Sequence, residues 1–101
     1  MFAITKDYLA DATKPAGTNS NAVGIVGPRG AKLTFEQIVN HANGKKFRMK
    51  DDDGELYYEG VYVETKSSDE LEPLDCFGEP NAGCTTLEMW KAGEGGGWEI
   101  V

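Results

Sequence analysis

The sequence has few of the side chains on which metal binding and catalysis usually depend. Among its 101 residues are two cysteines, Cys76 and Cys84, and a single histidine, His41. A structural zinc site takes four Cys or His ligands, which these three residues do not supply without help from carboxylates. No signature of a cysteine hydrolase surrounds them either. We therefore predict no enzymatic activity, no catalytic residue, no metal site and no cofactor.

Long apolar runs are also missing. No stretch of the chain approaches the roughly 20 apolar residues that cross a bilayer. The first residues, MFAITKDYLAD, alternate apolar and polar side chains, and they lack the basic and apolar regions of a signal peptide. We expect a cytoplasmic protein with no membrane partner. In a reducing compartment the two cysteines should be free thiols, whereas secretion would favour closure of the CFGEPNAGC loop by a disulfide.

What is present is enough apolar surface for one small domain over residues 1–101. Hydrophobic residues make up 40% of the chain and aromatic residues 10%, which suits a modest core. The segment KLTFEQIVNHANG predicts a helix at Phe35–Asn43, with Thr34 and Gln37 as a capping box and Gly44 after its end. Period-two patterns predict strands at Met1–Leu9, Lys46–Asp51 and Leu56–Glu64, and the short apolar segment Val23–Val26 predicts another. Thr85–Lys91 and Trp98–Val101 are expected to form a final hairpin closed by AGEGGG. The expected fold is α+β, with one helix packed on an antiparallel sheet of about five strands. Ala10–Ala22 and Thr65–Pro80 are predicted to be irregular.

The motif KDDDGELYYEG at residues 50–60 resembles a calcium loop but fails its spacing. With Gly54 at position 6 of an EF-hand loop, Met49 stands at position 1 and Gly60 at position 12, where acidic ligands are required. Asp-Gly between two strand patterns instead predicts a hairpin turn with an acidic tip. The glycine-rich stretches GEGGGW and GIVGPRG also fail as phosphate loops, because neither leads into the helix or the lysine that such a loop needs.

Charge is distributed unevenly along the chain. Residues 1–50 carry eight Lys or Arg and three Asp or Glu, whereas residues 51–79 carry eleven acidic residues and only Lys66. Such a segment repels nucleic acid and attracts basic surfaces, many of which bind nucleic acid. We predict no direct nucleic-acid binding and an acidic partner-binding face, with Tyr57 and Phe77 as exposed aromatic anchors. The predicted partner-binding residues are Asp51, Asp52, Asp53, Glu55, Tyr57, Glu59, Asp69, Glu70, Glu72, Asp75 and Phe77.

The stretches FRMKDDDGELYYEG, EPLDCFGEPNAGCT and GGGWEIV resemble a set of small acidic proteins of unassigned function from bacterial genomes, phages and plasmids. Cys76 departs from the pattern, which has aspartate there. The resemblance carries no catalytic residues, and it implies cargo of a mobile element. Small acidic proteins in that setting are often inhibitors of host defence, such as anti-CRISPR proteins.

The leading hypothesis is therefore an anti-defence protein of the anti-CRISPR type, acting in the host cytoplasm as a monomer or weak homodimer. Its partner would be the basic surface of a host defence complex, with a CRISPR–Cas effector favoured. The alternative is a regulatory or structural interaction module with no defence role. A small enzyme or metal binder ranks third.

Overall fold

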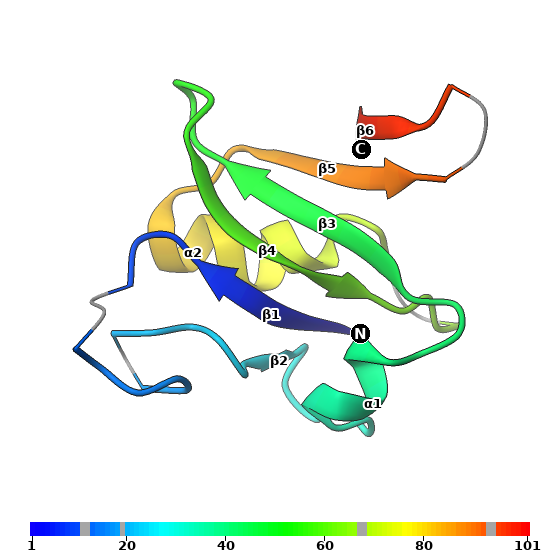
Figure 1. The fold of residues 1–101 in the computed structure, drawn as a ribbon, viewed down its shortest axis with the longest axis horizontal. Coiled ribbons are helices and arrows are strands. Elements are labelled where there is room, and N and C mark those ends of the chain that lie inside the picture. The colour runs from blue at the N-terminus through cyan, green and yellow to red at the C-terminus, as the bar shows by residue number, and fades with distance from the viewer. Residues whose placement is uncertain (11–12, 19, 67–68, 93–94) are drawn as a thin grey trace.

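Six antiparallel strands form a single sheet in the computed structural model, which describes residues 1–10, 13–18, 20–66, 69–92 and 95–101 (Figure 1). The order of the strands across the sheet is β2-β1-β4-β3-β5-β6. The elements along the chain are β1 (Phe2–Asp7), β2 (Val26–Gly27), α1 (Phe35–Val39), β3 (Lys45–Lys50), β4 (Leu56–Tyr62), the π-helical turn η1 (Leu74–Gly78), α2 (Glu79–Ala82), β5 (Thr86–Lys91) and β6 (Gly97–Ile100).

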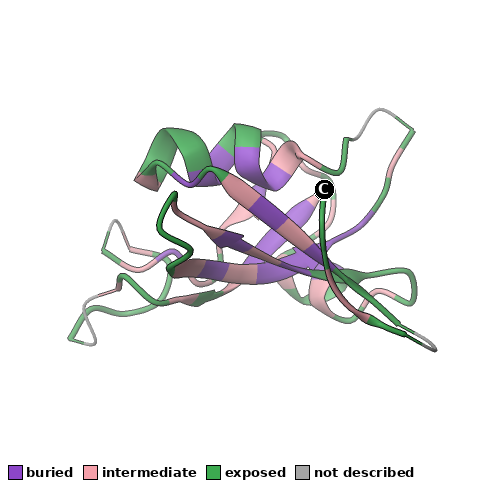
Figure 2. Ribbon diagram, turned by 90° about the horizontal axis from the view of Figure 1, so that it is seen from above, coloured by how far each residue is buried: buried purple, intermediate pink, exposed green. Residues whose placement is uncertain are grey.

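The main core lies between the sheet and the continuous helical segment η1–α2. Alternate strand residues face this segment, because successive side chains of a strand point to opposite faces. Figure 2 shows the buried residues between the two layers. The largest buried side chains of this core are Phe2, Ile4, Phe47, Met49, Tyr62 and Leu87.

A smaller core lies on the other face of the sheet. Helix α1 places Ile38, which is fully buried, against Ala3, Val61 and Val63. Because α1 has only five residues, it covers one end of this face. Over β3, β5 and β6, no helix formed by the described residues covers this face (Figures 1 and 2).

The α+β class and the positions of the main strands agree with the prediction, but three features differ. The sheet has six strands, and the second one is Val26–Gly27 rather than Val23–Val26. The helix ends at Val39 rather than Asn43. After it the chain turns tightly, with the Gly44 N–H donating to the His41 carbonyl at 3.0 Å. Gly44 also lies so close to Val61 that a Cβ there would be 2.8 Å from Val61 Cγ1.

The third difference is the helical segment η1–α2, which occupies part of the stretch predicted to be irregular. Leu71, Leu74 and Phe77 recur every three residues and pack on the sheet, but acidic residues between them conceal that period. Parts of the predicted loops Ala10–Ala22 and Thr65–Pro80, and of the AGEGGG connection, lie outside the described residues.

The capping box of α1 is confirmed, and it supports a prediction about stability. The Gln37 N–H donates to Thr34 Oγ1 at 3.2 Å, and the Thr34 N–H donates to Gln37 Oε1 at 2.9 Å. Thr34→Ala should lower the free energy of unfolding by about 0.5–2 kcal/mol, measured by urea denaturation. Thr85→Ala, at another exposed threonine, is the control and should change it by less than about 0.5 kcal/mol. Equal unfolding curves for the two variants would contradict the prediction.

Candidate functional site

The turn between β3 and β4 is the most acidic short stretch of the described chain, and its backbone is firmly set. The Asp51 N–H donates to the Glu55 carbonyl at 3.0 Å, and the Gly54 N–H donates to the Asp51 carbonyl at 3.1 Å. Gly54 has φ of 80°, in the left-handed region that glycine adopts without strain. This is the pattern of a type I turn followed by a G1 bulge, so the predicted hairpin turn is confirmed.

The Asp51 carboxylate hydrogen-bonds to the backbone of the turn and stabilises its conformation. Its Oδ1 accepts hydrogen bonds from the N–H groups of Asp53 and Glu55, each at 2.9 Å. The bond from Glu55 is the main reason that the pKa of Asp51 lies below its ordinary value, and a hydrogen bond from the Tyr57 hydroxyl adds to the effect. The same contact with Asp51 raises the pKa of Tyr57. Asp51 and Tyr57 thus support the tip, and Tyr57 remains half-buried beside it.

Three carboxylates are left to face solvent at this tip. Asp52, Asp53 and Glu55 are all exposed, and the turn that carries them is closed by the four hydrogen bonds given above. We call these three residues the acidic tip. Their charges are concentrated within four consecutive positions on a loop whose backbone is already ordered.

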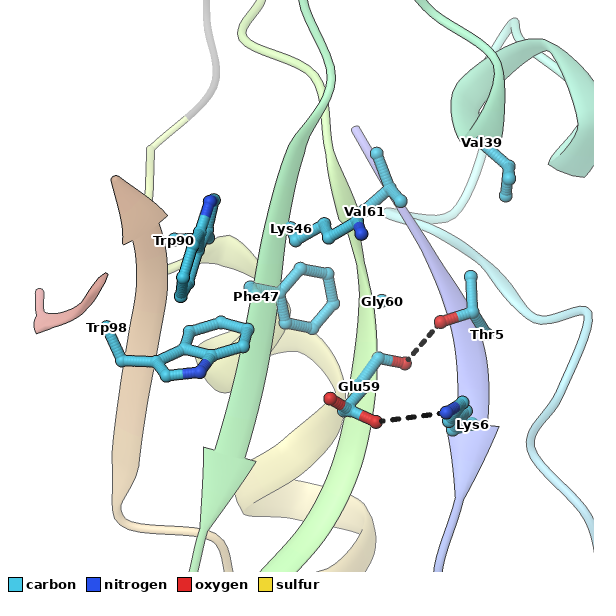
Figure 3. Close-up of a pocket in the computed structure, with 10 residues that line it drawn as sticks. All are labelled: Thr5, Lys6, Val39, Lys46, Phe47, Glu59, Gly60, Val61, Trp90 and Trp98. Carbon is cyan, nitrogen blue, oxygen red and sulfur yellow. Dashed lines mark hydrogen bonds and ion pairs between the residues drawn. The ribbon is translucent and has the colours of Figure 1, made fainter. Parts of the chain in front are cut away.

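Glu59 does not belong with the acidic tip. It lies on the sheet face that η1–α2 leaves uncovered, 3.9 Å from Lys6 Nζ on β1 (Figure 3). The Tyr8 hydroxyl also donates to its carboxylate. Across the strands, Glu59 stands opposite both Lys6 and Arg48, and Arg48 stands opposite Glu88. Charges of alternating sign therefore form a ladder across this face and largely neutralise one another.

Asp69, Glu70 and Glu72 lie at the opposite end of the sheet from the tip. Glu70 is 3.7 Å from Lys45, the first residue of β3, and Glu72 is 2.9 Å from the N-terminal amino group. Asp51 follows the last residue of β3, and a strand of six residues spans roughly 20 Å. The predicted acidic residues therefore form two separate groups. Asp75 is exposed on η1, three residues after Glu72 in the same helical segment.

Phe77 was predicted to be an exposed anchor, and that prediction is wrong. Its side chain is only 9% exposed and belongs to the main core. The ring packs edge-to-face on Tyr58, with centroids 5.0 Å apart and an interplanar angle of 64°. The reason is the helical turn η1, which directs Phe77 toward the sheet and leaves its acidic neighbour Asp75 in solvent.

The uncovered face of the sheet holds a groove that sequence reasoning missed. Its volume is about 520 Å³, within the range of small-ligand sites. Figure 3 shows Trp90 and Trp98 along one side, with Lys46 of β3 next to Trp90 and Val61 of β4 farther across the sheet. The two indole rings pack edge-to-face with centroids 5.4 Å apart. The signal available in the sequence was two tryptophans in consecutive predicted strands.

A charged cluster supports the two tryptophans. The Arg48 guanidinium lies 4.2 Å from the centre of the Trp98 ring, and its Nε is 2.6 Å from Glu88 Oε1. Lys50 Nζ is 3.0 Å from the same oxygen. Burial alone would raise the pKa of Glu88, but the hydrogen bonds from Arg48 and Lys50 outweigh it and hold that pKa below its ordinary value. These ion pairs orient Arg48 over the indole.

Both cysteines are free thiols, with Cys76 exposed and Cys84 buried. Burial raises the pKa of Cys84 to about 11. It also raises the pKa of Cys76, where the charges of Glu72 and Asp75 act in the same direction. Since the thiolate is the reactive form, neither cysteine is activated as a nucleophile.

Within the described residues, no group of three or more His, Cys, Asp or Glu side chains is arranged to hold a metal ion. None of the described helices is long and apolar enough to cross a membrane. No protein-family model matches this chain, and comparisons with curated proteins and with solved structures give no match.

Proposed function

We propose that this protein is a non-enzymatic inhibitor that docks its acidic tip on a basic surface of a partner and thereby excludes nucleic acid from that surface. The partner class is a host defence complex in the bacterial cytoplasm, with a CRISPR–Cas effector favoured. The single observation that supports the proposal most is the ordered tip, where Asp52, Asp53 and Glu55 are exposed on a turn held by Asp51. The setting rests on the resemblance to small acidic proteins of mobile elements.

Order in the tip matters because binding usually costs conformational entropy. A loop that becomes ordered only on binding binds more weakly, because its loss of conformational entropy opposes binding. A loop that is already ordered does not lose this entropy. The Asp51 carboxylate accepts two backbone hydrogen bonds within the turn, and the Tyr57 hydroxyl supports it from β4. The three outward carboxylates can therefore meet arginine or lysine side chains with little rearrangement of the backbone.

Charge acts mainly on the rate of encounter. The whole chain has a net charge of −7, which repels nucleic acid and attracts a basic channel. Exposed charges at the rim of an interface steer association more than they slow dissociation. Asp69, Glu70 and Glu72 contribute to this field only from a distance, because Glu70 and Glu72 are already paired at the other end of the sheet.

A regulatory or structural interaction module with no defence role is the second candidate. The same tip would serve it, and only the identity of the partner separates the two functions. Capture of a partner on the immobilised protein, followed by purification of that partner and an assay of its own nucleic-acid binding, decides between them. A partner with no nucleic-acid site would favour the second candidate.

Reversal of the tip charges is the direct test. Asp52→Lys, Asp53→Lys and Glu55→Lys together should slow association with the purified partner by about tenfold or more at low salt, while changing dissociation much less. The matched control is Glu36→Lys, Glu64→Lys and Glu70→Lys, which alters net charge equally at exposed sites outside the tip. The control should slow association less. Surface plasmon resonance at several salt concentrations measures both rates, and binding of the parent should weaken as salt rises.

Competition provides the second arm of that test. The parent protein and the partner's nucleic acid should exclude each other on the partner, and the protein alone should bind neither DNA nor RNA. If the tip variant associates and competes as well as the control variant, the tip is a solvated turn and the proposal is wrong.

A further inference from the structure

One edge of the sheet is open for pairing. Strand β6 stands last in the strand order, and among the described residues it pairs with β5 alone. The Val101 N–H donates to the Leu87 carbonyl at 3.0 Å, and hydrogen-bonded positions alternate along an antiparallel pair. Trp98, opposite Trp90, and Ile100, opposite Glu88, are therefore at non-hydrogen-bonded positions. Their backbone N–H and C=O groups point away from β5, toward the open edge.

The other edge of the sheet is protected in the ways that natural proteins use. Strand β2 has only two residues and is followed directly by Pro28. On the N-terminal side of β2, further backbone hydrogen bonds occupy the edge of β1. The Ile4 N–H donates to the Ile25 carbonyl at 2.9 Å, and the Gly24 N–H donates to the Ile4 carbonyl at 3.0 Å. Strand β6 has no proline, and its one charged residue, Glu99, is paired with Lys91 at 2.8 Å.

Apolar side chains gather at the same open edge. Ile100 is 68% exposed, Trp90 is 44% exposed and Val101 is 41% exposed. An edge that is both unpaired and apolar is a site for strand addition. We propose that β6 pairs with β6 of a second copy of this chain, in antiparallel orientation, on a two-fold axis that passes beside Trp98.

The pairing register follows from which residues would stand opposite each other. Pairing Trp98 with Ile100 of the second copy would place the two Glu99 residues face to face, and like charges directly opposite destabilise a pair. Pairing the two Ile100 residues would set Glu99 opposite the apolar Val101 of the second copy, which offers it no opposite charge. Pairing the two Trp98 residues uses the outward groups of Trp98 and Ile100 and sets Glu99 opposite Gly97 of the other copy.

Charge complementarity favours a second copy in this Trp98-centred register. Gly97 has no side chain, and on its far side it stands opposite Lys91 of β5. Glu99 of the second copy can therefore extend over Gly97 toward Lys91, which would then lie between the carboxylates of both Glu99 residues. Ile100 would stand opposite Gly96 and diagonal to Trp98 of the second copy, within reach of the indole. The two Trp90–Trp98 pairs would form one continuous row across the two-fold axis.

This dimer is independent of the proposed inhibitory function, because the acidic tip lies at a different part of the sheet from β6 (Figure 1). The two associations should also respond to salt in opposite ways. Docking of the tip on a basic partner should weaken as salt rises. Pairing of two copies, each of net charge −7, should strengthen because salt screens their repulsion.

Sedimentation equilibrium over about 5–500 µM protein, with reductant present because Cys76 is exposed, is the test, since dimer formation depends on concentration. The parent should become increasingly dimeric. Ile100→Pro removes one outward N–H without removing a bond to β5, a substitution that edge strands tolerate. It should raise the dimer dissociation constant by about tenfold or more. The control Ile100→Val keeps the N–H and a branched side chain, and should stay within about threefold of the parent.

Amide hydrogen exchange of the unaltered protein gives a second readout that does not depend on the folding of a variant. Exchange at Trp98 and Ile100 should slow as protein concentration rises, because dimer formation engages their N–H groups. Exchange at Glu99, whose N–H faces β5 in this alternation, should change less. A parent that stays monomeric throughout the range would overturn the proposal. So would a dimer in which Trp98 and Ile100 exchange at an unchanged rate, or one that Ile100→Pro leaves intact.

Discussion

Replacement of Phe77 by alanine is expected to lower the free energy of unfolding by about 3–5 kcal/mol, the range found for buried phenylalanines. The side chain is 9% exposed and lies among Tyr58, Leu74, Cys84 and Leu87 in the main core. Its removal takes away the edge-to-face contact with Tyr58 and leaves a cavity between η1 and the sheet. Such a loss is a large share of the roughly 5–15 kcal/mol that holds a small domain together.

Urea denaturation followed by circular dichroism measures this change. Leu9→Ala, at a side chain that is 52% exposed, is the control and should shift the free energy of unfolding by less than about 0.5 kcal/mol. The result also bears on function, because Phe77 was predicted from the sequence to contact a partner. A Phe77→Ala protein that unfolds like the parent but no longer binds the partner would show that Phe77 acts at an interface after all.

Gly60→Ala is expected to destabilise the protein by about 1–3 kcal/mol or more, although alanine is ordinarily the better strand residue by about 0.5–1 kcal/mol. A Cβ at position 60 would lie 2.1 Å from the Ala3 carbonyl oxygen and 2.5 Å from Phe47 Cζ. Strand β1 is held on both sides, so its backbone cannot move away easily. The Phe47 ring packs over Gly60, which stands directly opposite it on β4. The ring thereby covers the strand backbone that glycine leaves without a side chain.

A double-mutant cycle separates the two contacts at Gly60. Phe47→Leu in the Gly60→Ala background removes the ring but leaves the Ala3 carbonyl, so it should relieve only part of the strain. The free energies of unfolding of the parent, the two single variants and the double variant complete the cycle. Equal or greater stability of Gly60→Ala would mean that β1 and β4 can separate at this point without cost.

Much of the candidate site could be predicted from the sequence because it is built from neighbours along the chain. Asp-Gly between two period-two segments predicts the β3–β4 turn, and that turn presents Asp52, Asp53 and Glu55 to solvent. The same pattern did not reveal that the Asp51 carboxylate accepts hydrogen bonds within the turn. That engagement depends on the N–H groups of Asp53 and Glu55 and on the Tyr57 hydroxyl, which converge only after the hairpin has formed.

The grouping of charges illustrates what the sequence did not reveal. The acidic residues of the segment at 51–79 are close in the chain, but β4 carries the chain back along β3. Glu70 therefore reaches Lys45 at one end of β3, while the acidic tip stands at the other end. Glu59 faces a different layer and pairs with Lys6. One acidic segment thus becomes two acidic groups and a neutralised ladder.

By itself the sequence determined the local elements of this protein: the capping box at Thr34 and Gln37, the turn at Gly54 and the approximate bounds of the main strands. Each depends on backbone conformation and hydrogen bonds within a few residues. Only the tertiary structure decided that α1 ends at Val39, that Phe77 is buried, and that Trp90 and Trp98 lie beside an open edge. These features depend on which distant strands pair and which faces are covered, because burial of apolar surface is a property of the assembled layers.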